Sequence, residues 1–145
     1  LPTVKNVVLG LDGMCADMVE EFKFACFQHR ESGGPWWPGD FLKALDRGNL
    51  LLERCFPGAR FGRVEPGRAA DLVLWDYDPP TPLEAGNLAG HLAFGLGSRS
   101  VRSVVVDGRF VLRDRAPCFD AASIFAEGRA QAARLWERMD HQGGI

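Results

Sequence analysis

The residue best placed to do chemistry is Asp12, which follows a short apolar run at residues 7–10. We predict that this run forms a buried parallel strand, because continuous apolar runs are typical of strands covered on both faces. Asp12 would then stand at the carboxyl end of the strand, where parallel α/β folds place their chemistry. However, Asp12 also precedes Gly13, and an Asp-Gly pair is ordinary turn chemistry. Taken alone, the pair favours a simple turn.

Other residues that could bind a metal are few and scattered. The histidines His29, His91 and His141 stand in no shared motif. We interpret His91 as a core or turn histidine, and the other two as solvated residues at helix ends. No Cys-x-x-Cys pair occurs, which favours buried, reduced thiols in a cytoplasmic protein over a metal or redox site. The four cysteines are Cys15, Cys26, Cys55 and Cys118.

The composition bounds the class of protein. A chain of 145 residues is long enough for one ordinary domain, and 46% hydrophobic with 25% charged residues is typical of a soluble globular fold. The net charge of −2 and the scattered arginines argue against a nucleic-acid partner. No apolar run is long enough to predict a membrane span, and no basic and apolar leader precedes the first run. We therefore expect a cytoplasmic protein.

Helices are predicted to follow the first strand and to hold it in place. Asp17 is a good N-cap for an amphipathic helix that reaches about residue 29. Asp40 is predicted to cap a second helix, which Gly48 interrupts. Asn49 would then begin a third helix that ends before Pro57 and Gly58.

The stretch at residues 61–82 predicts a β-turn-β element. A turn with Pro66 and Gly67 leads into a strand at residues 72–75, and Asp71 can accept backbone N–H bonds at the strand's start. Residues 83–100 are expected to be irregular. Asp107-Gly108 between two β-branched runs predicts a hairpin with a type I′ turn.

The final helix is predicted to begin at Asp120 and to carry a broad apolar stripe. Because burial of such side chains is strongly favourable, we expect this stripe to dock firmly. Its residues are Ile124, Phe125, Gly128, Ala132, Leu135, Trp136 and Met139.

Several motifs resemble the amidohydrolase superfamily. GRVEPGRAADLVLWD at residues 62–76 is similar to the signature that opens the last part of its small β-sandwich domain, and VRSVVVDGRFVLRD at 101–114 is similar to a second strand block. VLGLDGM at 8–14 resembles the last barrel strand, with Leu11 in place of a small hydroxyl residue. Three further motifs resemble most closely the SsnA-type aminohydrolases, near the chlorohydrolase and deaminase branch: DYDPPTPL, NLAGHLAFG and ARLWERM.

The resemblance implies an α/β fold in three parts. Residues 1–57 would be the C-terminal end of a (β/α)8 (TIM-like) barrel. Residues 58–118 would be the C-terminal half of a composite β-sandwich domain, and 119–145 a C-terminal helix.

The resemblance also implies a role for Asp12. In the family, the acidic residue after the last barrel strand binds the catalytic divalent metal, zinc or iron, and takes a proton from the attacking water. Asp12 is the residue that matches. The implied reaction is hydrolysis of a non-peptide C–N bond, or less often a C–Cl bond, in a small cyclic or amidine-like substrate.

The family's His-x-His motif and its two further histidine ligands have no counterpart among these 145 residues. We therefore expect the chain to be a fragment or a separate subunit whose partner is the missing N-terminal barrel portion, and to be inactive and metal-free alone. The alternative is a non-catalytic scaffold or interaction module that retains only the β-sandwich. A homo-oligomer remains open.

Overall fold

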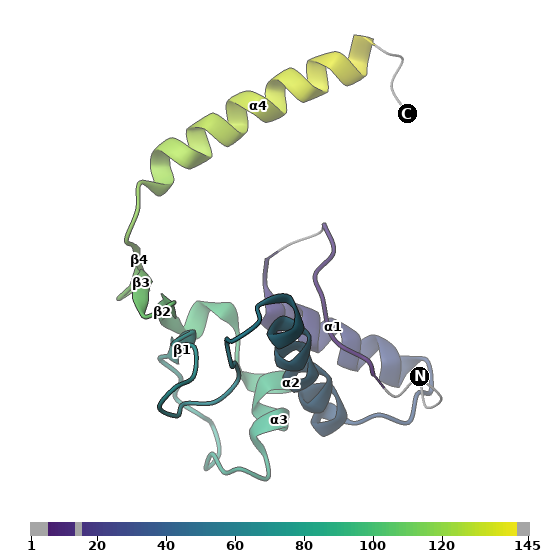
Figure 1. Cartoon of the computed structure of the whole chain (residues 1–145). Coiled ribbons are helices and arrows are strands. Elements are labelled where there is room, and N and C mark those ends of the chain that lie inside the picture. Colours follow the sequence, from purple (N-terminus) through teal and green to yellow (C-terminus); the bar gives the residue numbers. More distant parts are fainter. Residues whose placement is uncertain (1–5, 14–15, 142–145) are drawn as a thin grey trace.

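The computed structural model describes residues 6–13 and 16–141 and combines helices with one antiparallel sheet (Figure 1). Two long helices, α1 (Met18–Glu31) and α2 (Pro38–Cys55), pack against a short helical segment made of α3 (Leu88–Gly90) and the π-turn η1 (His91–Gly95). A 3₁₀ turn at Ser98–Ser100 leads to the sheet. This is the mixed α/β class that the sequence predicted.

The start of α1 is set by Asp17, as predicted. Its carboxylate accepts hydrogen bonds from the backbone N–H groups of Val19, at 2.9 Å, and Glu20, at 3.1 Å. These bonds satisfy amides that have no partner within the helix. Hydrogen bonding by Ser98 is the largest of the causes that hold the pKa of Asp17 below its ordinary value.

The predicted break at Gly48 was wrong, because α2 runs without interruption. A glycine inside a helix costs only about 1 kcal/mol relative to alanine. Burial of Phe41 and Ala44 on the same helix outweighs that cost. Asp40 lies in the first turn, three residues after the N-cap residue Trp37, and helps to cap the helix from there, because its carboxylate accepts the backbone N–H of Trp37 at 3.1 Å.

The core is small and lies between α1, α2 and η1. Its buried members are Phe22 and Cys26 from α1, Phe41 from α2 and Ala93 from η1. The ring of Phe41 meets that of Phe22 edge to face, with 6.4 Å between centroids. Leu9 also packs against this cluster, so the N-terminal segment is anchored to the helices.

Residues 7–10 do not form the predicted strand. A parallel strand exists only where neighbouring strands complete its hydrogen bonds. The four strands of the described part of the chain pair with one another in a separate antiparallel sheet. The segment is held instead by Leu9 and by the guanidinium of Arg47, which donates to the carbonyl of Val7 at 3.1 Å.

The region at residues 83–100 is more ordered than predicted. It contains α3, η1 and the 3₁₀ turn, all built from short-range hydrogen bonds. The sequence predicted only an irregular segment here. The π-turn instead buries His91 and Ala93.

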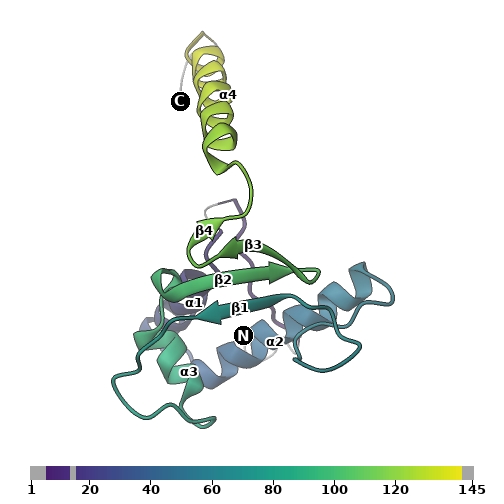
Figure 2. The ribbon, with the colours of Figure 1, turned by 90° about the vertical axis from the view of Figure 1, so that its left-hand side faces the viewer.

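The sheet has the order β1-β2-β3-β4, from β1 (Leu72–Trp75), β2 (Val101–Val106), β3 (Arg109–Arg113) and β4 (Ala116–Pro117). Figure 2 looks onto the sheet and draws α1 behind it, with α2 and α3 alongside the β1 edge. Asp71 accepts the backbone N–H of Asp107 at 2.7 Å, which ties the start of β1 to the hairpin turn. The sequence predicted that Asp71 could accept a backbone N–H at the strand's start, but not that the donor would lie in the hairpin turn.

The hairpin turn is confirmed, since Asp107 and Gly108 both have positive φ, 49° and 73°. We expect Gly108→Val to lower the free energy of unfolding by more than about 1 kcal/mol, because a β-branched residue is strained in this conformation. A Cβ added at this position would meet no atom within 4 Å, so the expected loss comes from backbone strain. Gly108→Asn is the control, because asparagine tolerates positive φ. Equal urea midpoints for the valine variant and the wild type would contradict the prediction.

The predicted docking of the last helix was wrong. Helix α4 (Ala121–His141) has no buried residue and projects away from the helices and the sheet (Figure 1). Phe125 is 65% exposed and Trp136 is 64% exposed. Asp120 directly precedes the first helical residue and accepts the backbone N–H of Ser123 at 3.1 Å. The helix itself was predicted correctly, but no described part of the chain buries its apolar face.

Candidate functional site

Asp12 lies in a turn at the end of the anchored N-terminal segment. It precedes Gly13, is exposed, and has a φ of 50°. Aspartate adopts this left-handed conformation more readily than most residues. Leu9 and the bond from Arg47 to the Val7 carbonyl hold the segment on the helices. They therefore fix the position of the chain just before the turn that contains Asp12.

The described part of the chain does not bring two further metal-ligating side chains to Asp12. Within residues 6–13 and 16–141, no three His, Cys, Asp or Glu side chains lie close enough together to hold a metal ion. A catalytic zinc is normally held by three protein ligands. One exposed carboxylate does not satisfy that requirement, so these residues alone do not fit a bound metal.

His91 is a core histidine, as the sequence suggested. It is 7% exposed, and both ring nitrogens have partners: Tyr77 Oη lies 2.8 Å from Nδ1 and Thr81 Oγ1 lies 3.3 Å from Nε2. The two hydroxyls tie the loop after β1 to η1. With both nitrogens engaged, His91 has no free lone pair for a metal.

A cleft of about 280 Å³ opens beside His91. Tyr77, Thr81 and Asn87 supply its polar groups, and Phe94 part of its apolar wall. The amide of Asn87 is already used, because it accepts from the backbone N–H of Glu84 and donates to the Pro82 carbonyl, both at 2.8 Å. The motif DYDPPTPL was noted in the sequence, but its link to His91 was not foreseen.

His29 is not the solvated residue that the sequence suggested. Its Nε2 accepts the backbone N–H of Trp36 at 3.0 Å. Its ring meets that of Phe41 edge to face, with 5.5 Å between centroids. His29 therefore closes the loop between α1 and α2 over the core. His141 is exposed at the end of α4, as predicted.

The prediction of buried thiols is confirmed for Cys26 and was wrong for Cys55 and Cys118. Cys26 is buried, and burial raises the pKa of its thiol. Cys55 is the last residue of α2 and Cys118 directly follows β4, and both are exposed. Cys15 lies outside the described residues.

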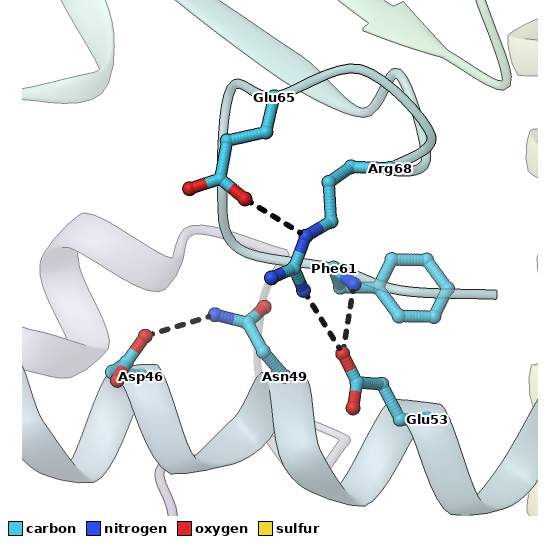
Figure 3. A network of polar contacts seen from close by, with 6 residues as sticks. All are labelled: Asp46, Asn49, Glu53, Phe61, Glu65 and Arg68. Atoms are coloured by element: carbon cyan, nitrogen blue, oxygen red, sulfur yellow. Dashed lines mark hydrogen bonds and ion pairs between the residues drawn. The ribbon is translucent and has the colours of Figure 1, made fainter.

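A polar network joins α2 to the loop that leads into β1 (Figure 3). Glu53 accepts the backbone N–H of Phe61 at 3.1 Å and lies 3.7 Å from the guanidinium of Arg68. Arg68 also contacts Glu65, at 3.4 Å. Gly62, with a φ of 77°, passes so close to Asn49 that an added Cβ would collide with the asparagine side chain. The sequence suggested a turn here, but not its attachment to α2.

This network has a mechanical consequence for the candidate site. The helix that Glu53 ties to the loop before β1 also carries Arg47, which holds the carbonyl of Val7. The sheet and the segment that carries Asp12 are therefore attached to the same helix.

None of the helices in the described residues combines the length and the hydropathy that a membrane crossing requires.

Most of the chain matches the model of a single protein family. Residues 4–111 match the model of the Amidohydrolase family. This range includes Asp12, α1 to α3, β1, β2 and the start of β3.

Curated relatives agree with this match. The chain is 31% identical over 143 residues to a 5-methylthioadenosine/S-adenosylhomocysteine deaminase of Haloarcula marismortui, covering 92% of this chain and 32% of that protein. It is 30% identical to a protein of the same name from Desulforamulus reducens, covering 90% and 31%. A 5′-deoxyadenosine deaminase of Methanosarcina mazei is 27% identical, with 93% and 32% covered. The chain thus spans about a third of the length of these relatives.

Proposed function

Because the chain belongs to the amidohydrolase family, we propose that it forms the C-terminal part of a metal-dependent deaminase. Such an enzyme replaces the amino group on a ring carbon with oxygen from water and releases ammonia. The relatives' names all contain an adenosine derivative. In adenine, the carbon that bears the amine belongs to an amidine-like unit. We therefore propose a 5′-modified adenosine as substrate, in preference to chlorohydrolase chemistry.

We further propose that residues 1–57 supply the last strand and helices of a (β/α)8 barrel, and 58–118 half of a β-sandwich. Two observations support this division. Residues 7–10 are apolar and Val8 is 40% exposed, as expected of a strand whose neighbours belong to other polypeptide. In the sheet, Val73 and Trp75 remain 47% and 37% exposed, which suits a face that a second sheet would cover.

In this proposal Asp12 supplies one carboxylate to a divalent metal site, and polypeptide beyond these 145 residues supplies the other ligands. The metal, zinc or iron, would activate water for attack. Asp12 would accept a proton from that water and deliver it to the leaving nitrogen, which departs as ammonia. The observation that carries the assignment is its place directly after the anchored apolar segment, within the residues that match the family.

The test is an assay of the longer polypeptide that contains this chain. We expect it to release ammonia from 5′-methylthioadenosine, S-adenosylhomocysteine or 5′-deoxyadenosine. A chlorinated ring compound, assayed for chloride release, is the control for the competing chemistry. If the longer protein binds a divalent metal yet releases no ammonia from any of these nucleosides, the proposal fails, and chloride release in its place would assign the competing chemistry.

The 145-residue chain alone is expected to purify without stoichiometric zinc, iron or manganese and to show no deaminase activity. The reason is that a single carboxylate cannot replace the three protein ligands of a catalytic zinc site. Elemental analysis after dialysis against a chelator measures this directly. Stoichiometric metal that survives dialysis would mean that these residues build a metal site of their own.

A further inference from the structure

His29 attaches the loop at residues 32–37 to the core, and the proposed chemistry makes no use of this contact. Its Nε2 accepts a hydrogen bond from the backbone N–H of Trp36, with 3.0 Å between the nitrogens. The imidazole also packs against the rings of Trp36 and Phe41, with 5.8 Å and 5.5 Å between centroids. The backbone at Gly34 passes so close that an added Cβ would collide with the imidazole. The imidazole thus lies between this loop and α2.

Only the neutral imidazole can make this hydrogen bond. A backbone N–H only donates, so Nε2 presents its lone pair and the ring proton lies on Nδ1. In the imidazolium both nitrogens carry protons, and neither can accept. A half-turn of the ring does not restore the bond, because it brings a carbon to the position of Nε2. The rings of Trp36 and Phe41 can attract a cation, but this attraction does not return the hydrogen bond to the Trp36 amide.

We propose that His29 is a pH-sensitive latch, closed over Trp36 while the imidazole is neutral and released when it becomes protonated. Histidine is the side chain whose charge ordinarily changes between about pH 8 and pH 5. Because the bond belongs to the neutral form, the latch is closed at the upper end of this range and opens as the pH falls. Opening frees residues 35–36, since Gly34 remains tied by its own N–H, which donates to the His29 carbonyl at 2.8 Å. This inference does not depend on the proposed enzymatic activity.

The charges around His29 favour its release on protonation. Arg30 donates to the Gly34 carbonyl at 2.7 Å, and its guanidinium lies 4.3 Å from the centre of the Trp37 ring. One cation is therefore already attached to this loop, and a like charge nearby disfavours a second. Residues 32–37 contain no ionisable side chain. Among the described residues, none of the ion pairs includes His29, so no carboxylate compensates the charge of an imidazolium there.

The start of α2 should stay capped while the latch opens. Its charged residues next to Phe41 are Asp40 and Lys43, which pair with one another at 3.2 Å. The bond that the Asp40 carboxylate accepts from the Trp37 amide is the largest of the causes that hold the pKa of Asp40 below its ordinary value. Such a carboxylate keeps its charge throughout the range in which histidines become protonated. Acid therefore releases Trp36 while Trp37 stays bound.

NMR of the 145-residue chain between pH 8 and pH 5 tests the latch. At pH 8 we expect the ring nitrogens of His29 to show a proton on Nδ1 and a lone pair on Nε2. The protection factor of the Trp36 amide, which corrects for the pH dependence of exchange itself, should fall at least about tenfold as His29 becomes protonated. The Trp37 amide should keep its protection, because Asp40 still binds it.

His29→Gln is the matched variant, because the glutamine Oε1 reaches about as far as Nε2 and accepts a hydrogen bond without titrating. We expect this variant to keep the Trp36 amide protected from pH 8 to pH 5. His141→Gln is the control, since His141 is exposed at the end of α4, and it should leave the transition unchanged.

Three results would overturn the proposal. The Trp36 amide could keep its protection while His29 becomes protonated, or lose it equally in the wild type and in His29→Gln. The imidazole could also stay neutral down to pH 5. In each case His29 would be a fixed part of the core and not a latch.

Discussion

Phe41→Ala is expected to remove about 3–5 kcal/mol from the free energy of unfolding, the usual cost of deleting a buried aromatic ring. Phe41 is 2% exposed, and its ring packs edge to face against the rings of Phe22, His29 and Trp36. A domain of ordinary stability has only about 5–15 kcal/mol in total, so the loss is a large share. Urea unfolding followed by tryptophan fluorescence measures it, because Trp36 lies 5.3 Å from the ring.

Phe24→Ala is the matched control for this prediction. Phe24 also lies within a long helix, but it is 72% exposed. The same substitution there removes little buried surface, and we expect a change within about 0.5 kcal/mol. If both variants lose the same stability, the core described between α1, α2 and η1 is not what holds the helices together.

The elements that the sequence predicted well are those set by neighbouring residues. Asp107 and Gly108 specify a turn by their own conformational preferences, and the structure has positive φ at both. Asp17 caps a helix by bonding to amides two and three residues away. Neither feature needs a partner distant in the sequence, so local chemistry is sufficient.

The predictions that failed depend on distant partners. Gly48 was expected to break a helix, but the burial of Phe41 on that helix outweighs its weak local preference. Residues 7–10 have the composition of a strand, yet the described chain gives them no neighbouring strand. The stripe of α4 has the pattern of a buried face, but a pattern does not say which surface will cover it.

The candidate site was predictable only in part. Asp12 was found because it follows an apolar run and matches a family motif, and it is the described residue on which the proposal rests. The role of His29 could not be inferred, because its bond joins a residue of α1 to Trp36, seven positions further on in the following loop. The bond between Tyr77 and His91 spans fourteen residues, and no periodic pattern connects them.

In the complete protein, Asp12→Asn is expected to fold normally yet lose at least about 100-fold in kcat, the low end of general acid–base contributions. Asparagine has nearly the same shape and also tolerates the φ of 50° found at Asp12. It carries no charge and cannot accept the proton that the proposed reaction releases. In the 145-residue chain, the same change should shift the free energy of unfolding by no more than about 1 kcal/mol, as at an ordinary turn position.

Asp107→Asn is the control that separates chemistry from turn geometry. Asp107 has almost the same φ, 49°, and also precedes a glycine in an exposed turn. The two variants therefore make the same change in the same local conformation, and only the one at Asp12 should lower kcat. If both proteins keep full activity, Asp12 is a turn residue and not the proton acceptor. If both lose activity equally, the loss comes from disturbed folding, which the unfolding measurements on the 145-residue chain would reveal.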